Sequence, residues 1–185
     1  RASGKPVARL ARDWTLRSGF PLVSVDAVCS KGERTITLRQ QQFLLDRRAS
    51  TTRLWSIPVQ IGTVDGKPDY VLLDKRSQTF KRPGCTDPLV IDPHSVGYYR
   101  VQYAPQLLAD LMPRLRQLPD SARVKVVTDA SILFSESRLP VATFFDMVNT
   151  LNDEPRVAVW RLVLDRMLSL DHMARGDAAT RSFDA

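Results

Sequence analysis

The spacing of apolar residues along the chain changes near residue 103. Before that point, short runs of alternating apolar and polar residues are broken by Gly, Pro and Asp, which is typical of strands joined by tight turns. After it, apolar residues recur every three or four positions, the period of helices with one buried face. A chain that passes from strands to helices in this way favours two domains over one alternating sheet. We therefore predict an α+β protein, with an antiparallel β-sandwich at residues 1–103 and a helical domain at residues 104–185.

The first part is predicted to contain seven short strands, a number and spacing that favour a sandwich. The residues between the first two strands, Ser30-Lys31-Gly32-Glu33, are turn formers and predict a hairpin. Pro58 indicates an edge strand or a bulge, because proline cannot donate a ladder hydrogen bond. The expected strands lie at residues 22–28, 35–38, 55–61, 70–74, 77–81, 89–92 and 97–103.

Four helices are predicted in the second part, over residues 106–116 and from residues 120, 140 and 155 onwards, as the start of a bundle or solenoid. Pro113 should kink the first helix or end it early. The third should bury Val141 and Phe145 along with Phe144, Val148 and Leu151. Between Trp160 and Leu170 the apolar residues exceed the single stripe that one core needs. We expect this fourth helix to expose apolar surface and drive self-association, unless the terminal segment folds back over it.

Alternation in the last strand, Gly97 to Tyr103, places Tyr99 and Tyr103 in the core and Tyr98 and Arg100 outside. Two hypotheses fit the outer pair. An aromatic ring beside an arginine could stack on a nucleic-acid base. Alternatively, the arginine pairs with a carboxylate at a domain seam. We favour the second.

Composition and charge narrow the range of partners. The chain is 43% hydrophobic and 25% charged, as in ordinary globular proteins, and its net charge is +7. The basic residues are dispersed over turns, at Arg47-Arg48, Lys75-Arg76 and Lys81-Arg82, so we expect solvated loops and no nucleic-acid partner. Nothing in the sequence reaches the length of about 18 apolar residues that a membrane-spanning helix needs. No membrane partner and no targeting segment are therefore expected.

Candidate chemistry is sparse. The two histidines, His94 and His172, have no partner at helical spacing, and no H-E-x-x-H, G-x-S-x-G or phosphate-binding glycine motif occurs. Cys29 and Cys85 fit buried thiols or one disulfide, but they do not fit a four-ligand zinc site. The pair Asp153-Glu154 is interpreted as a solvated loop rather than an acid–base pair. We therefore predict no catalytic, cofactor-binding or metal-binding residue in this chain.

Several short motifs follow one another in a recognisable order. Gly97-Tyr-Tyr-Arg-Val-Gln-Tyr103 resembles the junction between the β-sandwich and the helical domain in zinc metallo-aminopeptidases of the aminopeptidase N and endoplasmic-reticulum aminopeptidase type. Further segments that are similar to this family are Trp14-Thr-Leu-Arg-Ser-Gly-Phe-Pro-Leu-Val23, Leu38-Arg-Gln-Gln-Gln-Phe43, Trp55-Ser-Ile-Pro58, Arg123 with Asp129, and Pro155 with Trp160. The family pattern differs at two positions, with Gln42 where arginine is usual and Asp92 near a common asparagine.

The resemblance implies a non-catalytic C-terminal fragment of an enzyme that removes N-terminal residues from peptides. The sandwich would act as a spacer, and the helices would begin a bowl that covers the active site and helps to hold the peptide. The catalytic domain, with its zinc, would precede this chain, so the zinc is expected outside it. The expected partners are the other domains of the same protein and the peptide substrate.

Three further expectations concern enzyme activity, location and an alternative function. The parent protein would be an enzyme, whereas this chain alone lacks the zinc and catalytic motifs. The expected location is cytoplasmic, with a periplasmic or secreted protein as the alternative. A free-standing module that binds a protein or peptide is the alternative function, and it would need no missing catalytic domain.

Overall fold

The computed structural model describes residues 7–16, 18–44 and 53–175. The chain forms two compact units, Arg1–Ala122 and Arg123–Ala185. Two β-sheets and several helices confirm the predicted α+β class. The predicted domain boundary after residue 103 falls at the end of the last strand, and it stays a prediction. The polar loop predicted around Arg47 and Arg48 lies outside the described residues.

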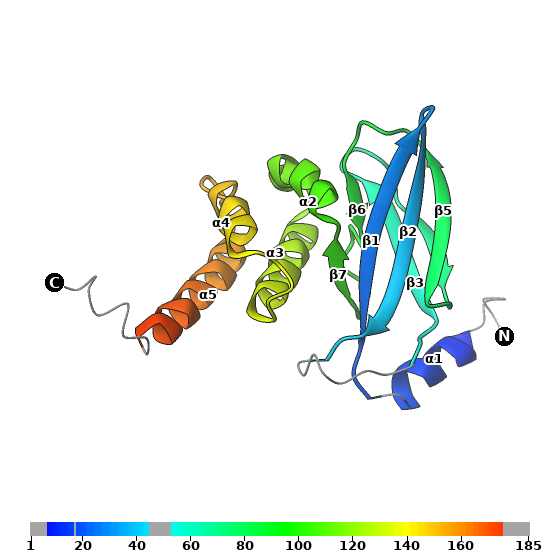
Figure 1. Cartoon of the computed structure of the whole chain (residues 1–185), viewed down its shortest axis with the longest axis horizontal. Coiled ribbons are helices and arrows are strands. Elements are labelled where there is room, and N and C mark those ends of the chain that lie inside the picture. The colour runs from blue at the N-terminus through cyan, green and yellow to red at the C-terminus, as the bar shows by residue number, and fades with distance from the viewer. Residues whose placement is uncertain (1–6, 17, 45–52, 176–185) are drawn as a thin grey trace. The chain divides into compact units, whose positions relative to one another are not determined.

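In the described part of the first unit, seven strands form two sheets, as the turn spacing predicted (Figure 1). One sheet has the order β5-β2-β1-β7 and the other the order β4-β3-β6. All neighbours are antiparallel except β1 and β7, which run parallel with Leu22 opposite Arg100. The strands are β1 (Pro21–Ser30), β2 (Glu33–Gln42), β3 (Ile57–Thr63), β4 (Asp69–Leu73), β5 (Ser77–Pro83), β6 (Leu89–Ile91) and β7 (Arg100–Tyr103).

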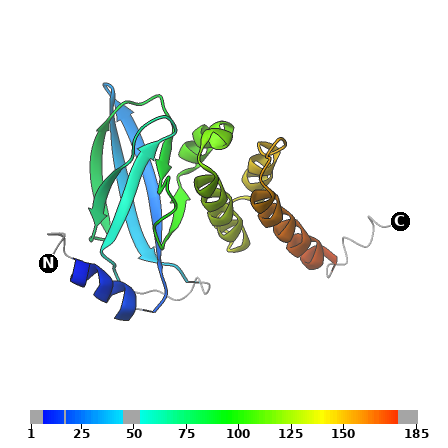
Figure 2. The same ribbon diagram turned by 180° about the vertical axis from the view of Figure 1, so that it is seen from behind.

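The predicted hairpin between β1 and β2 closes with a two-residue turn. Ser30 lies opposite Glu33, and the two residues between them, Lys31 and Gly32, have φ of 51° and 77°. Two consecutive positive φ angles characterise the type I′ turn, whose twist matches that of the flanking strands. Helix α1 (Val7–Leu16) lies at the opposite end of the strands from this turn (Figure 2).

Inward-facing residues of both sheets form one apolar core, which includes Trp55 and Tyr99. Pro58 lies in β3, the central strand of its sheet, yet it has a strand neighbour on one side only. It faces Leu72 of β4, whereas β6 pairs with β3 only from Ile61 to Thr63. The strand is therefore a local edge at Pro58, which tolerates the missing N–H group.

The first predicted helix is divided at Pro113. Helix α2 (Pro105–Leu111) gives way to the 3-10 helix η1 (Met112–Gln117), because proline removes an α-helical hydrogen bond and clashes with the preceding turn. Arg114 ties η1 to the sheets, since its Nη2 lies 2.8 Å from Oδ2 of Asp65. These two short helices therefore belong to the first compact unit.

Three longer helices follow: α3 (Asp120–Ser135), α4 (Val141–Asn149) and α5 (Val157–Arg175). In the second unit, the rings of Phe134 and Phe144 stack with centroids 5.0 Å apart. Val141 and Phe145 are 53% and 42% exposed, so the prediction that α4 buries them was wrong. The buried apolar residues of this unit are Val126, Val127, Ala130, Leu133, Phe144, Met147, Leu151, Val159 and Val163.

Helix α5 buries one narrow face. Val159 and Val163 are fully covered, whereas Leu164 and Leu168 are 55% and 59% exposed. The surplus of apolar residues in this helix thus lies at the surface of the second unit, as its sequence indicated. In the part of the chain that the structure describes, no helix is long and apolar enough to cross a membrane.

Candidate functional site

A buried turn positions the Gly-Tyr-Tyr-Arg segment on which the family resemblance rests. Asp92 is 1% exposed and has a left-handed φ of 58°, a conformation that Asp and Asn adopt more readily than most residues. Its carboxylate accepts hydrogen bonds from the backbone N–H groups of Val96 and Gly97, at 3.0 and 2.9 Å. Each carboxylate oxygen accepts one of these bonds, whereas an asparagine side chain has only one oxygen that can accept. Asp92 therefore closes this turn although the family commonly has asparagine nearby.

The two tyrosines then point to opposite sides, as the alternation predicted. Tyr99 is 3% exposed and belongs to the core, whereas Tyr98 is 70% exposed. A Cβ atom on Gly97 would collide with the Tyr99 ring, so glycine is required for this close approach. Tyr103 packs against the core, and its hydroxyl accepts a hydrogen bond from the N–H of Ile91 at 2.9 Å.

The exposed Tyr98 belongs to an aromatic cluster at the α1 end of the sandwich, made of Trp14, Phe20, Phe43, Trp55 and Tyr98. Tyr98 meets Trp14 and Phe20 edge-on, with centroids 6.0 and 5.7 Å apart, and Phe20 stacks on Phe43. These rings come from α1, from both ends of the β1–β2 hairpin, from the segment before β3 and from the segment before β7, with the centroids of Trp14 and Trp55 6.4 Å apart. The cluster therefore joins segments that are distant in sequence.

Arg100 extends this cluster with a cation. Its guanidinium carbon lies 5.6 Å from the centroid of the Phe20 ring, within the range of a cation–π contact. Within the described residues, both ring contacts of Tyr98 are edge-on, so no described aromatic ring lies parallel to it.

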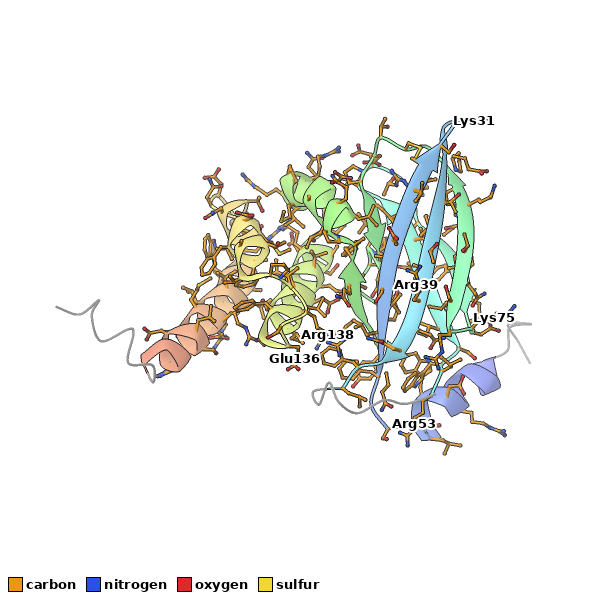
Figure 3. The ribbon with its side chains drawn as sticks, viewed as in Figure 1. Lys31, Arg39, Arg53, Lys75, Glu136 and Arg138 are labelled. Carbon is orange, nitrogen blue, oxygen red and sulfur yellow. A yellow bond between two sulfur atoms is a disulfide. The ribbon has the colours of Figure 1, made fainter. Side chains whose placement is uncertain are left out.

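Beside the cluster, a cavity of about 660 Å³ opens between α1 and the segment before β3. Asp13 accepts a hydrogen bond from the N–H of Ser56 at 2.9 Å. Arg53, which is labelled in Figure 3, donates one to Ser18 Oγ at 2.8 Å. The described lining residues of the cavity include carboxylates and a guanidinium, and among them no nucleophile is paired with a general base. Its lining is Asp13, Leu16, Ser18, Arg53, Leu54, Trp55, Ser56 and Asp74.

The histidines are far from any catalytic arrangement. His94 is exposed, and its ring Nδ1 lies 3.2 Å from Nε2 of Gln60. His172 is exposed near the end of α5, in the other compact unit. Within the described ranges, no group of three or more His, Cys, Asp or Glu side chains could hold a metal ion.

The interpretation of Asp153-Glu154 as a solvated loop was wrong for Glu154, which is 5% exposed. Its Oε1 accepts a hydrogen bond from Arg123 Nη2 at 3.1 Å, and its Oε2 lies 2.9 Å from Arg123 Nε. Its Oε1 also accepts the N–H of Arg156, and its backbone carbonyl accepts the indole N–H of Trp160 at 2.8 Å. The position of Glu154 between the polar pair Asn152-Asp153 and Pro155 made a loop the natural interpretation, because the sequence does not show that Arg123 is its partner.

The sequence motif Arg123 with Asp129 also proves to be structural. Asp129 is 2% exposed, and its Oδ2 lies 3.3 Å from Nζ of Lys125 one helical turn earlier. Arg123 and Asp129 thus place buried charges on α3, each with an oppositely charged group beside it. Such buried pairs fix geometry within a helical unit.

Cys29 and Cys85 are joined by a disulfide, so of the two alternatives left open by the sequence the bridge is correct. Their Cα atoms are 5.8 Å apart. Cys29 is exposed at the end of β1, and Cys85 is half-buried in the segment after β5. The bridge therefore joins segments on either side of β2.

Comparison with known proteins assigns this arrangement to a family. Residues 89–185, just over half of the chain, match the family model of the ERAP1-like C-terminal domain. The chain is similar to puromycin-sensitive aminopeptidase of Caenorhabditis elegans, with 26% identity over 94% of the chain, and to human aminopeptidase N, with 29% identity over 83%. It is also 26% identical to aminopeptidase N of Lactococcus lactis over 80% of its length. The chain spans less than a fifth of each of these three relatives, namely 19%, 16% and 17%. From the Gly-Tyr-Tyr-Arg junction to its last helix, this chain belongs to the ERAP1-like C-terminal domain family.

Proposed function

We propose that this chain is a non-catalytic C-terminal part of a zinc aminopeptidase that removes N-terminal residues from peptides. The proposal is supported by the alignment with known proteins. Relatives with aminopeptidase names align over most of this chain, yet the chain covers under a fifth of the length of each relative. The family model is that of a C-terminal domain by its description. Activity would then reside in the remaining four fifths of such a protein.

The residues of this chain do not fit a zinc centre. A catalytic zinc site needs three protein ligands and an open position. His94 and His172 lie in different compact units, and both cysteines are bonded to each other in the disulfide. In the described segments, no group of side chains could hold a metal ion. The zinc of the proposed enzyme therefore belongs to a domain outside this chain, and no step of the reaction is assigned to residues here.

The sandwich is proposed to support the catalytic domain through its α1 end. Leu16 and Tyr98 are 76% and 70% exposed there, beside the cavity and the aromatic cluster. Large apolar side chains exposed at one end of a domain favour contact with another folded part of the same protein. In this proposal, the helical unit helps to enclose the peptide substrate, and its buried charge pairs keep its helices in a fixed arrangement.

The disulfide bears on the compartment. Protein disulfides persist in the periplasm, the secretory pathway and the extracellular space, and are rare in the reducing cytoplasm. Of the two locations that the sequence leaves open, the periplasmic or secreted one is therefore the one we propose. Mass spectrometry of protein isolated from its source under thiol-trapping conditions tests this, and two alkylated cysteines would support a cytoplasmic location instead.

The proposed function predicts what precedes Arg1 in the gene. The reading frame should encode an H-E-x-x-H helix upstream, because a zinc peptidase needs two histidines on one helical face. The longer protein should bind zinc and release N-terminal residues from peptides, whereas the variant with both motif histidines changed to alanine should do neither. An initiator methionine immediately before Arg1 would instead favour the free-standing binding module.

A further inference from the structure

The disulfide lies beside a buried cation. Arg34 of β2 is the Cα partner of Cys29, and its Nη2 donates hydrogen bonds to the backbone carbonyls of Cys85 and Asp87, at 2.8 and 2.7 Å. Arg34 is 7% exposed. Arg34 therefore pairs with Cys29 through the strand backbone and with the Cys85 segment through its guanidinium, at the end of the sandwich marked by Lys31 in Figure 3.

Among the described residues, this guanidinium has no carboxylate partner. The acidic groups nearby are directed elsewhere: Glu33 pairs with Lys81, and the Asp87 carboxylate accepts the N–H of Asp65 and lies 3.8 Å from Arg114. Arg82, the neighbour of Arg34 on β5, pairs with Asp69. Two carbonyl dipoles solvate the positive charge of Arg34, but they do not neutralise it. A thiolate formed next to it would be stabilised.

From this arrangement we propose that Cys29–Cys85 is a thiol–disulfide exchange site, opened by a dithiol reductant that attacks Cys29 while Arg34 stabilises the departing thiolate of Cys85. Cys29 is the more exposed residue of the bridge, which favours attack at its sulfur. A lower pKa of the leaving thiol speeds the exchange. Arg34, whose guanidinium donates to the backbone carbonyl of Cys85, supplies the positive charge that stabilises this leaving thiolate.

The electrons balance in two steps. A reductant thiolate attacks Cys29 Sγ and forms a mixed disulfide, while the S–S electron pair passes to Cys85 Sγ. The second thiolate of the reductant then attacks the reductant's first sulfur, which is bonded to Cys29 Sγ in the mixed disulfide. This closes the reductant's own disulfide and releases the thiolate of Cys29. The dithiol ends as a cyclic disulfide, having given two electrons, and the two cysteines take up its two protons.

The segment after β5 stays attached when the bridge opens. The N–H of Gly84 donates to the carbonyl of Gly32 at 2.8 Å, and Arg34 keeps its two hydrogen bonds. Opening is therefore expected to be local and reversible. In an oxidising compartment the bridge would be closed until the protein meets a dithiol reductant, which makes it a redox-responsive contact between the β1–β2 hairpin and the segment after β5.

The test equilibrates the chain with reduced and oxidised dithiothreitol at a series of ratios, traps the thiols by alkylation and counts them by mass spectrometry. The bridge of the unchanged chain should open while near-ultraviolet circular dichroism stays native. Arg34→Met should need roughly tenfold more reducing conditions, equivalent to about 30 mV for a two-electron couple. Arg82→Met is the matched control and should leave the midpoint unchanged. Equal shifts of the redox midpoint in the Arg34→Met and Arg82→Met variants would overturn the proposal. A bridge that opens only when the chain unfolds would overturn it as well.

A second measurement covers the case in which Arg34→Met does not fold. In the Cys29→Ser variant, Cys85 is a single thiol beside an intact Arg34. The pH dependence of its alkylation rate should give an apparent pKa below the ordinary thiol value of about 8.5. An apparent pKa at or above that value would show that Arg34 does not stabilise the thiolate, and the proposal would be wrong.

Discussion

Arg123 and Glu154 form a buried, two-pronged ion pair between residues 31 positions apart in the sequence. Their side chains are 7% and 0% exposed. The same glutamate accepts the N–H of Arg156, and its carbonyl accepts the indole N–H of Trp160. The pair thus links the start of α3 to the start of α5 within one compact unit, through a residue whose sequence context suggested a solvated loop.

Removing one partner of this pair should destabilise the helical unit strongly. Glu154→Ala leaves the Arg123 guanidinium buried without its carboxylate, and such losses cost about 3–5 kcal/mol. Urea unfolding followed by circular dichroism and Trp160 fluorescence measures the change. Lys81→Ala is the control, because it removes an exposed pair with Glu33 and should cost at most about 1 kcal/mol. Similar losses in the two variants would contradict the assignment.

Replacing both partners together should restore much of the lost stability. Arg123→Met with Glu154→Met removes both charges and keeps comparable volume, a change that is often neutral or stabilising for a buried pair. The double variant is therefore expected to unfold at a higher urea concentration than Glu154→Ala alone. A double variant that is less stable than Glu154→Ala would contradict the view that the unpaired buried charge of Arg123 is the main cause of the loss in the single variant.

The adjacent tyrosines 98 and 99 should differ in their effect on stability. Tyr99→Ala removes a buried core ring and should cost about 3–5 kcal/mol, whereas Tyr98→Ala removes a ring that is 70% exposed and should cost much less. Tyr103→Phe should cost about 1–3 kcal/mol, because it leaves the N–H of Ile91 without its acceptor. Denaturant unfolding of the three variants checks the order, and a larger loss at Tyr98 than at Tyr99 would show that the strand register is wrong.

At Asp92, conformation and hydrogen bonding can be separated by substitution. Asp92→Ala should cost about 2–4 kcal/mol, because alanine must adopt a left-handed φ and two backbone N–H groups lose their acceptor. Asp92→Gly relieves only the conformational part, and Asp92→Asn keeps an oxygen acceptor and tolerates the φ. Thermal unfolding should therefore rank the variants Asn, Gly and Ala in order of decreasing stability. An Asn variant as unstable as the Ala variant would contradict this account of the turn.

The purified chain should hydrolyse no aminoacyl substrate and retain no stoichiometric zinc. Two histidines in separate compact units cannot supply the three ligands of a catalytic site. Metal analysis after dialysis, together with an aminopeptidase assay, checks this. One zinc per chain with measurable turnover would overturn the proposed division between this chain and the catalytic domain.

Helix α5 should cause the isolated chain to self-associate. Leu164 and Leu168 lie one turn apart and are both more than half exposed, which leaves apolar surface uncovered. Light scattering over a concentration series should show a rising average mass. Changing both leucines to lysine should abolish the rise, whereas changing the neighbouring exposed residues Arg161 and Asp165 to alanine should not. A chain that is monomeric at every concentration would refute the expectation.

Much of the architecture followed from the sequence because it depends on local chemistry. Period-two alternation, Gly and Pro at the turns and the later three- to four-residue period determined seven strands followed by helices. The same alternation determined which of Tyr98 and Tyr99 faces the core. Pro113 likewise determined where the first helix changes to a 3-10 helix, since the missing N–H is a property of that residue alone.

Only the tertiary structure decided which distant groups meet. The parallel pairing of β1 with β7, the ion pair of Arg123 with Glu154 and the contact of Arg34 with the Cys85 segment each join residues separated by tens of positions. The exposure of Val141 and Phe145 depended in the same way on how the helices pack. Alternation and helical period specify which residues share a face, but not which element that face meets, because the partner is selected by packing over the whole fold.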